Sequence, residues 1–243
     1  MKTIGVIPAR LGSTRLKQKV LARIAGKPMI QHVWERASQS QKCDEVLIAC
    51  DDKRIMKAAK KFGARAVLTS RDHQSGSDRI AEVARSSDAD IFVNIQGDEP
   101  LIDARTIDAL VEALEQDTKT SMATVIKEFL PDEDEGDPNV VKVVVDDDGF
   151  AQSFSRGVPN TRRQIFKHIG IYAYRKDFLI QFSEMPKSAN ETRERLEQLR
   201  VLDAGFAIKT VLTDIEMIGV DTQADLLKVE ERLKSYGKNS QNR

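Results

Sequence analysis

The loop that follows the apolar segment 3–7 combines four cations with small residues. The cations are Arg10, Arg15, Lys17 and Lys19, and the small residues are Gly12, Ser13 and Thr14. Backbone N–H groups of a glycine-containing loop can hold a phosphate, arginine grips phosphate oxygens in pairs, and lysine adds a point charge. The spacing of Arg10, Arg15 and Lys19 suits a triphosphate, with a solvated basic loop as the alternative. The loop lacks GxxxxGKS/T and GxGxxG, so it is not a P-loop, and a dinucleotide fold has no support.

Two aspartates each end an apolar stretch, Asp98 in VNIQGDEPLI and Asp221 in IGVDTQADL. A carboxylate in such a position can hold Mg2+, which keeps several waters and takes only one or two protein carboxylates. The alternative for both residues is a helix N-cap, because each is followed by a helical pattern. Asp225 could be an ordinary acid of the first helical turn, where the helix dipole favours negative charge.

The segment SRDHQSGSDR could also approach a ligand closely. Ser75, Gly76 and Ser77 are small enough for backbone contact, and Arg79 could pair with an anion. An ordinary helix start, with Ser77 as its N-cap, is the alternative.

A further group of polar residues occurs in KHIGIYAYR and RERLEQLR. His168 lies beside an apolar strand, and a lone histidine is more often structural than catalytic. Glu197 and Gln198 are adjacent on an expected helix, so they point about 100° apart and only one need face a site. The three histidines of the chain lack metal-ligand spacing, which argues against a zinc site.

The elements that must position these residues alternate over the first ~120 residues, which favours an α/β fold. Short apolar strands are expected at 3–7, 45–50, 64–69 and 89–98, and amphipathic helices at 29–40, 52–63, 75–87 and 104–116. This order predicts a mostly parallel, Rossmann-like sheet with helices on both faces. Ligands of such sheets bind beyond the carboxyl ends of the strands, where the loop after 3–7 and Asp98 should lie.

After residue 120 the pattern becomes β-rich. Strands are expected at 121–127, 139–155 and 167–175, with Asp148-Gly149 as a hairpin turn and the acidic stretch 131–139 as solvated surface. Helices are expected at 193–205 and 222–236. We therefore expect one domain, 1–236, with a nucleotide-binding half (1–121), a β-rich insertion (122–175) and C-terminal helices (176–236). Residues 237–243 are expected to be a disordered tail.

The overall composition narrows the class of protein. The chain has 243 residues with 38 basic and 38 acidic side chains, so a chain-wide footprint for nucleic acid or an anionic membrane is absent. Two cysteines without a CxxC pair argue against a disulfide framework. There is no signal region and no apolar run near eighteen residues, so we expect a cytoplasmic protein.

The chain resembles the 3-deoxy-manno-octulosonate (Kdo) cytidylyltransferases, also called CMP-Kdo synthetases. The resemblance runs colinearly from about Ile7 to Leu226. The matching pieces are IPARLGSTRL, IAGKPMIQHVWERA, DHQSGSDRIAEV, VNIQGDEPLI, DPNVVKVVVDDDGFA, FSR, KHIGIYAYR, LEQLR and GVDTQADL. Their combination is highly specific, whereas the wider nucleotidyltransferase superfamily shares only the first piece loosely.

The resemblance implies that CTP and an acidic keto-sugar react with Mg2+ to form the CMP-sugar and pyrophosphate, for lipopolysaccharide biosynthesis. It assigns the triphosphate to Arg10, Arg15 and Lys19, Mg2+ to Asp98 and Asp221, and catalysis to Arg10, Arg15, Lys19 and Asp98. It assigns the cytidine to Pro8, Ala9, Ser75, Gly76 and Arg79, and the sugar to Gln96, Arg156, His168, Tyr172, Glu197 and Gln198. A homodimer with contacts in 122–175 is also implied.

Two departures from the family pattern leave the sugar open. The family usually has LPGKPL where this chain has LKQKVL, and ALYFSR where it has AQSFSR. Kdo, its 8-amino form, sialic acid and a sugar phosphate therefore remain candidate acceptors. A non-catalytic nucleotide-binding relative is the alternative from a different class, and retention of Lys19, Asp98 and Asp221 argues against it.

Overall fold

The computed structural model describes residues 1–13 and 16–240. The strands are β1 Thr3–Ala9, β2 Arg23–Ile24, β3 Lys27–Pro28, β4 Glu45–Cys50, β5 Arg65–Leu68, β6 Ile91–Asn94, β7 Met122–Lys127, β8 Lys142–Val145, β9 Ala151–Ser155, β10 Ile165–Arg175 and β11 Ile208–Leu212. The helices are η1 Lys19–Leu21, α1 Met29–Ala37, α2 Lys53–Lys61, α3 Gly76–Arg85, α4 Ala104–Gln116, α5 Lys176–Glu184, α6 Ala189–Glu194, α7 Leu199–Asp203 and α8 Gln223–Ser240. None of the described helices is both long enough and apolar enough to cross a membrane.

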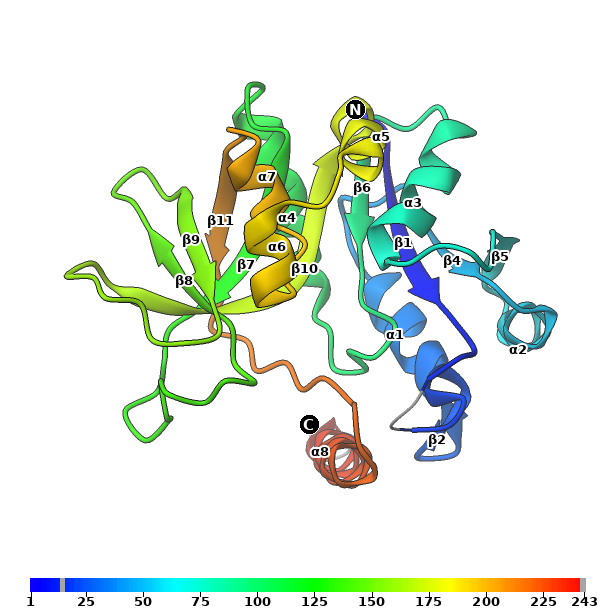
Figure 1. The fold of residues 1–243 in the computed structure, drawn as a ribbon. Coiled ribbons are helices and arrows are strands. Elements are labelled where there is room, and N and C mark those ends of the chain that lie inside the picture. The colour runs from blue at the N-terminus through cyan, green and yellow to red at the C-terminus, as the bar shows by residue number, and fades with distance from the viewer. Residues whose placement is uncertain (14–15, 241–243) are drawn as a thin grey trace.

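The central sheet has the strand order β11-β7-β10-β6-β1-β4-β5 (Figure 1). β1 pairs in parallel with β4 and β6, β4 with β5, and β7 with β11. β10 is antiparallel to both of its neighbours, β6 and β7. The α/β class with a mostly parallel sheet is therefore confirmed, and the carboxyl ends of β1, β4 and β6 meet at one edge.

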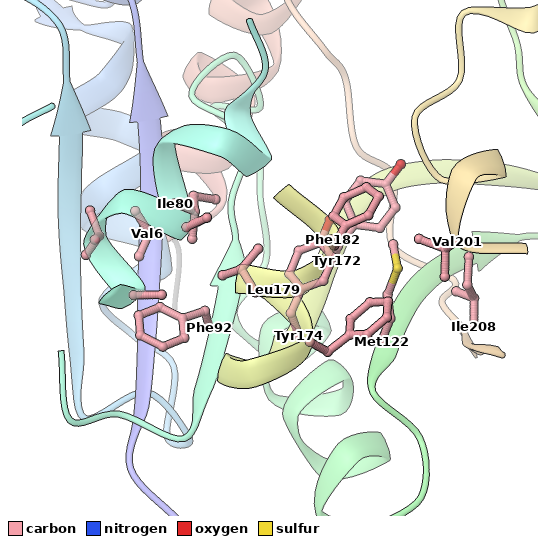
Figure 2. Packing of buried hydrophobic residues seen from close by; sticks show 14 of the residues in the cluster. Val6, Ile80, Phe92, Met122, Tyr172, Tyr174, Leu179, Phe182, Val201 and Ile208 are labelled. Carbon is pink, nitrogen blue, oxygen red and sulfur yellow. The ribbon is translucent and has the colours of Figure 1, made fainter. Parts of the chain in front are cut away.

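Side chains alternate between the two faces of this sheet, as the pleat requires. Ile4 and Val6 of β1 join a core with α3 and α5, whereas Ile7 joins a second core with α1, α2 and α4. Figure 2 shows the first core, where Tyr174 from β10 and Phe182 from α5 lie among strand residues. Helices thus cover both faces, as the alternating apolar segments predict.

The segment 122–175 is more closely integrated than an insertion attached to the sheet. β7 and β10 are strands of the central sheet, and only β8 and β9 branch off the first half of β10. Both halves of β10 pair with β7 on one side, with an irregularity between Ile169 and Tyr172, while on the other side its first half pairs with β8 and its second half with β6. The expected hairpin turn is present, with Gly149 at φ +78°.

Two local expectations are wrong. The N-cap of α3 is Ser75 rather than Ser77, because Ser75 and Asp78 form a reciprocal capping box that satisfies both backbone N–H groups. The helix expected at 193–205 is two short helices, since Arg195 adopts a left-handed conformation that ends α6. α8 continues to Ser240, and its Leu226 and Val229 pack with Ile24 of β2 and Met29 of α1.

Candidate active site

A cavity of about 310 Å³ opens beside the carboxyl ends of β1 and β6 and the start of α3. Its lining includes Pro8, Ala9, Arg10, Lys19, Ser75, Gly76, Arg79, Gln96, Asp98 and Asp221. The structure therefore brings the nucleotide and metal residues expected from the sequence into one place. Arg15 is the exception, because it lies outside the described residues.

The charged centre of this cavity is an ammonium held between two carboxylates. Lys19 Nζ lies 2.6 Å from Asp98 Oδ2 and 2.8 Å from Asp221 Oδ1. Burial alone would lower the pKa of Lys19, but the carboxylates of Asp98 and Asp221 outweigh it and raise the pKa above its ordinary value. Lys19 therefore carries a full positive charge at neutral pH.

Neither aspartate caps a helix in this structure. The N-cap of α4 is Asp103, whose carboxylate accepts a hydrogen bond from the Arg105 backbone N–H. At the start of α8, the Thr222 hydroxyl accepts from the Asp225 N–H, and the Asp225 carboxylate accepts from the Thr222 N–H. The helix-cap alternative for Asp98 and Asp221 is therefore excluded, and their carboxylates face the cavity.

The donor set fits a small divalent cation. The side chains of Asp98 and Asp221 are 33% and 43% exposed, so each could bind a cation while water fills its other positions. Mg2+ takes one or two carboxylates, keeps several waters and accepts substrate phosphate oxygens. Among the described residues no group of three or more His, Cys, Asp or Glu could hold a metal. The pair therefore suits Mg2+ with a bound phosphate better than a metal that requires an all-protein cage.

A third acid, Glu99, was missed by the sequence reasoning. Burial, reinforced by the charge of Asp98, raises the pKa of Glu99 to about 8. Its Oε2 is buried without a hydrogen-bond partner among the described residues. The only signal in the sequence is its position directly after Asp98. At neutral pH Glu99 is mainly protonated, so it adds little negative charge to the cluster.

Two glycines allow the cavity walls to approach each other closely. A Cβ at Gly97 would lie 3.0 Å from the Pro8 carbonyl oxygen, and a Cβ at Gly76 would lie 3.2 Å from Pro8 Cγ. Arg79 is almost fully buried, and its Nη1 donates to the Ser70 carbonyl at 3.0 Å. The guanidinium of Arg79 therefore braces the loop after β5 as well as lining the cavity.

A larger cavity, of about 1010 Å³, adjoins the first one. The two cavities share Gly76 and Gln96. The larger cavity is also lined by His168, Tyr172, Glu197 and Gln198, which the family resemblance assigns to a sugar pocket. Arg156 lines neither cavity. Its Nε donates to the Glu194 carbonyl at 3.2 Å and its Nη1 to the Pro138 carbonyl at 3.1 Å.

Glu197 and Gln198 both face this cavity, because they lie in the turn between α6 and α7 instead of on one helix. Ser77 Oγ donates a short hydrogen bond to Glu197 Oε1, and the Tyr172 hydroxyl donates to Gln198 Oε1 at 3.3 Å. Burial raises the pKa of Glu197, with Ser77 opposing the shift. Ser77 was expected to be a helix N-cap, and in the structure its hydroxyl instead orients the carboxylate of Glu197.

His168 is held as a neutral ring. The Thr124 hydroxyl lies 3.0 Å from the Ile171 carbonyl and 2.9 Å from His168 Nε2, and when it donates to the carbonyl, Nε2 is the donor to Thr124 Oγ1. Burial lowers the pKa of His168 to about 3. The ring packs between Phe154 and Tyr172. It can therefore donate or accept a hydrogen bond, but it brings no charge to an anionic ligand.

Three cations also line the larger cavity: Lys127, Lys167 and Arg195. Lys167 forms an ion pair with Glu133, and Lys127 Nζ donates to the Asp214 carbonyl at 3.2 Å. Their spacing in the chain follows no motif, since they come from β7, β10 and the turn after α6. The tertiary structure alone places them around one space.

Comparison with known proteins agrees with this geometry. The family described as cytidylyltransferase matches residues 4–215. The 3-deoxy-manno-octulosonate cytidylyltransferase of Geotalea daltonii is 49% identical over 98% of this chain and 100% of its own length. That of Solibacter usitatus is 49% identical over 96% of this chain and 95% of its own.

Solved structures show the same relationship. A CMP:2-keto-3-deoxy-manno-octonic acid synthetase complexed with CTP has a TM-score of 0.92 and 42% identity, covering 97% of this chain and 100% of that one. A 4-diphosphocytidyl-2C-methyl-D-erythritol synthase from Anaerococcus prevotii has a TM-score of 0.65 at 15% identity, which shows a shared fold alone. The match over nearly the whole length of named relatives identifies this chain as a member of the 3-deoxy-manno-octulosonate cytidylyltransferase family.

Proposed function

We propose that this protein transfers the cytidylyl group of CTP to 3-deoxy-D-manno-octulosonate, giving CMP-Kdo and pyrophosphate. The observation that carries the proposal is the Lys19–Asp98–Asp221 cluster in a cavity that adjoins a second, larger one. One cavity suits a nucleotide triphosphate, and the other has room for an eight-carbon sugar acid. Two substrates in adjoining cavities meet the main requirement of phosphoryl transfer, which is positioning.

The nucleotide would occupy the smaller cavity. Pro8, Ala9, Ser75, Gly76 and Arg79 would contact the cytidine, since these residues line the same cavity as the charged cluster. Arg10 is exposed at the mouth of the cavity, and its guanidinium makes no hydrogen bond or ion pair with the described residues. It is free to bind a phosphate, and Arg15 would add a second guanidinium.

Lys19 would neutralise the pyrophosphate that leaves. In the free protein its ammonium balances Asp98 and Asp221. These two carboxylates would hold one or two Mg2+ ions, which when bound would neutralise the phosphates and lower the pKa of the sugar hydroxyl. With Asp98 and Asp221 holding the metal, the ammonium of Lys19 would be available to bind the phosphate oxygens. The hydroxyl of the sugar would then attack the α-phosphorus in line.

The acceptor would occupy the larger cavity. Gln96, Tyr172, Glu197 and Gln198 offer hydrogen bonds to sugar hydroxyls, and His168 offers a neutral imidazole. Gln96 Nε2 donates to the Gly170 carbonyl at 2.8 Å, which holds its amide oxygen free at the border between the cavities. Arg156 would take part only after its guanidinium leaves the carbonyls that it now contacts.

Assembly and location form part of the same proposal. A homodimer through segment 122–175 would cover exposed apolar side chains there, of which Leu130 and Val158 are 53% and 55% exposed. The product would enter lipopolysaccharide biosynthesis in the cytoplasm. Sedimentation of the purified protein measures its mass, and a monomer at all concentrations would contradict the dimer.

Pyrophosphate release tests the reaction directly. The purified protein is given Mg2+ with CTP, UTP, ATP or GTP, and Kdo, 8-amino-Kdo, sialic acid or a sugar phosphate as acceptor. We expect release only with CTP and Kdo together, and none when Mg2+ is removed by a chelator. Release with another acidic sugar would identify a related cytidylyltransferase, whereas silence with every pair would overturn the proposal.

A further inference from the structure

Arg195 stands out on the wall of the larger cavity because of its backbone. It ends α6 at φ +57° and ψ +44°, and its N–H donates to the Glu191 carbonyl at 2.8 Å. In this left-handed region a Cβ crowds the backbone, so glycine is the usual residue at the end of a helix. A long cationic side chain at such a position, beside a ligand cavity, is a reason to look for a function.

The charges around the cavity distinguish Arg195 from the other cations. Lys167 is neutralised by its ion pair with Glu133. The ammonium of Lys127 donates to the backbone carbonyl of Asp214, and Asp214 also lines the cavity. Arg195 is exposed, and its guanidinium makes no hydrogen bond or ion pair with any described residue. An anion entering the larger cavity would therefore find in Arg195 a cation that loses no existing partner on binding.

Arg156 and His168 are the two residues with cationic side-chain types among those that the resemblance assigns to the sugar, and both are less available to a carboxylate in this structure. The guanidinium of Arg156 donates to the carbonyls of Glu194 and Pro138 and does not line the cavity. His168 is neutral, since burial lowers its pKa to about 3. Neither residue supplies a free charge at the cavity wall, whereas Arg195 does.

We propose that Arg195 binds the carboxylate of the acceptor sugar and thereby selects an acidic acceptor over a neutral one. A guanidinium matches a carboxylate with two parallel N–H donors, which gives direction as well as charge. The turn that carries Arg195 also carries Glu197 and Gln198, so the carboxylate and the hydroxyls of one sugar would be recognised by one short segment. This inference rests on the proposed function.

The test compares acid and ester. Michaelis constants for CTP, Kdo and the methyl ester of Kdo are measured for the wild type, Arg195→Gln, Arg156→Gln and Arg193→Gln. Arg193 is the matched control, because it is an exposed arginine of α6 that pairs with Glu194 and lines neither cavity. We expect Arg195→Gln to raise the KM for Kdo about tenfold, which corresponds to ~1.4 kcal/mol, and to leave the KM for CTP unchanged.

Arg195→Gln should also lose the preference for acid over ester, while Arg193→Gln keeps it. An unchanged acid-to-ester ratio in Arg195→Gln would overturn the inference, as would a loss confined to Arg156→Gln. A wild type that fails to turn over CTP with any acidic sugar would instead reject the proposed function. If another acidic sugar is the substrate, the same comparison is made with that sugar and its ester.

Arg195→Gly separates recognition from structure. Glycine accepts the left-handed conformation without strain, so we expect the melting temperature to rise by about 2–4 °C. The KM for Kdo should nevertheless rise as in Arg195→Gln. A glycine variant that is more stable and still binds Kdo with the wild-type KM would show that Arg195 has no part in acceptor binding.

Discussion

Replacing Asp98 by Asn removes one of the two carboxylates that hold Lys19 while keeping the size of the side chain. In the structure Asp98 Oδ2 lies 2.6 Å from Lys19 Nζ, and Asp221 lies 2.8 Å from the same nitrogen. The variant therefore leaves Lys19 with one carboxylate, and it leaves the proposed metal site with Asp221 alone. Folding and turnover should respond very differently to this change.

The effect on folding should be small. A charge-assisted hydrogen bond contributes about 1.5–3 kcal/mol, and an exposed ion pair about 0–1 kcal/mol. The side chain of Asp98 is 33% exposed and Lys19 keeps Asp221, so we expect a loss of about 1 kcal/mol in the free energy of unfolding. For a chain of this length that is a fall of roughly 2–4 °C in melting temperature.

The effect on turnover should be large. A metal that neutralises transferring phosphates stabilises the transition state by several kcal/mol. Taking about 3–4 kcal/mol as the loss, and 1.36 kcal/mol for each factor of ten, the expected fall in kcat is between two and three orders of magnitude. The contrast between a few degrees and several hundredfold is the signature of a ligand residue.

Pyrophosphate release is measured against Mg2+ concentration, alongside thermal unfolding. Asp103→Asn is the matched control, because Asp103 is a nearby aspartate that caps α4 and lines neither cavity. Asn is as good an N-cap as Asp, so this control should keep both stability and activity. The metal assignment would be refuted if Asp98→Asn kept more than a tenth of the wild-type kcat at saturating Mg2+.

Three further predictions concern other parts of the molecule. His168 has a pKa of about 3 against an ordinary 6.5, so the unfolded chain takes up its proton first as the pH falls. The free energy of unfolding should therefore be unaffected by His168 above pH 6.5 and about 2 kcal/mol lower at pH 5 because of it. Urea unfolding should show that His168→Gln lacks this dependence on pH. An equal dependence in the variant would contradict the lowered pKa. Arg200→Met leaves the buried Glu191 carboxylate unpaired and should cost about 3–5 kcal/mol in the same assay, and a loss below 1 kcal/mol would contradict this. Gly97→Ala pushes a Cβ against the Pro8 carbonyl, so calorimetry should show CTP binding at least about tenfold weaker; wild-type affinity would mean that this wall yields.

The elements of the fold could be predicted from short-range patterns. The helix expected at 104–116 has the bounds of α4, and the strand expected at 45–50 has the bounds of β4. Apolar periodicity indicates which face of a helix or strand is buried, and this pattern can be recognised within a single element without knowledge of the rest of the fold. The types of residue at the site were likewise readable, because cations and acids after apolar strands point to phosphate and metal chemistry.

Decisions between local alternatives needed the tertiary structure. Asp98 and Asp221 were equally compatible with helix caps, and the caps proved to be Asp103 and Thr222. Glu197 and Gln198 face one cavity only because Arg195 breaks the helix before them. Nearby hydrogen bonds decided the first case and the backbone conformation of Arg195 decided the second, and both depend on geometry that the sequence pattern does not contain.

By itself, the sequence determined the α/β class, the order of the elements, the kinds of side chain available for chemistry and the family likeness. The tertiary structure decided which of them meet. Lys19 contacts a carboxylate 79 residues away and another 202 residues away, and Arg156 donates to the carbonyls of Glu194 and Pro138 instead of lining the cavity. Such contacts form because the sheet brings the ends of its strands together, and burial then favours partners of suitable charge and distance. Proximity in three dimensions decides these contacts, and separation along the chain does not reveal it.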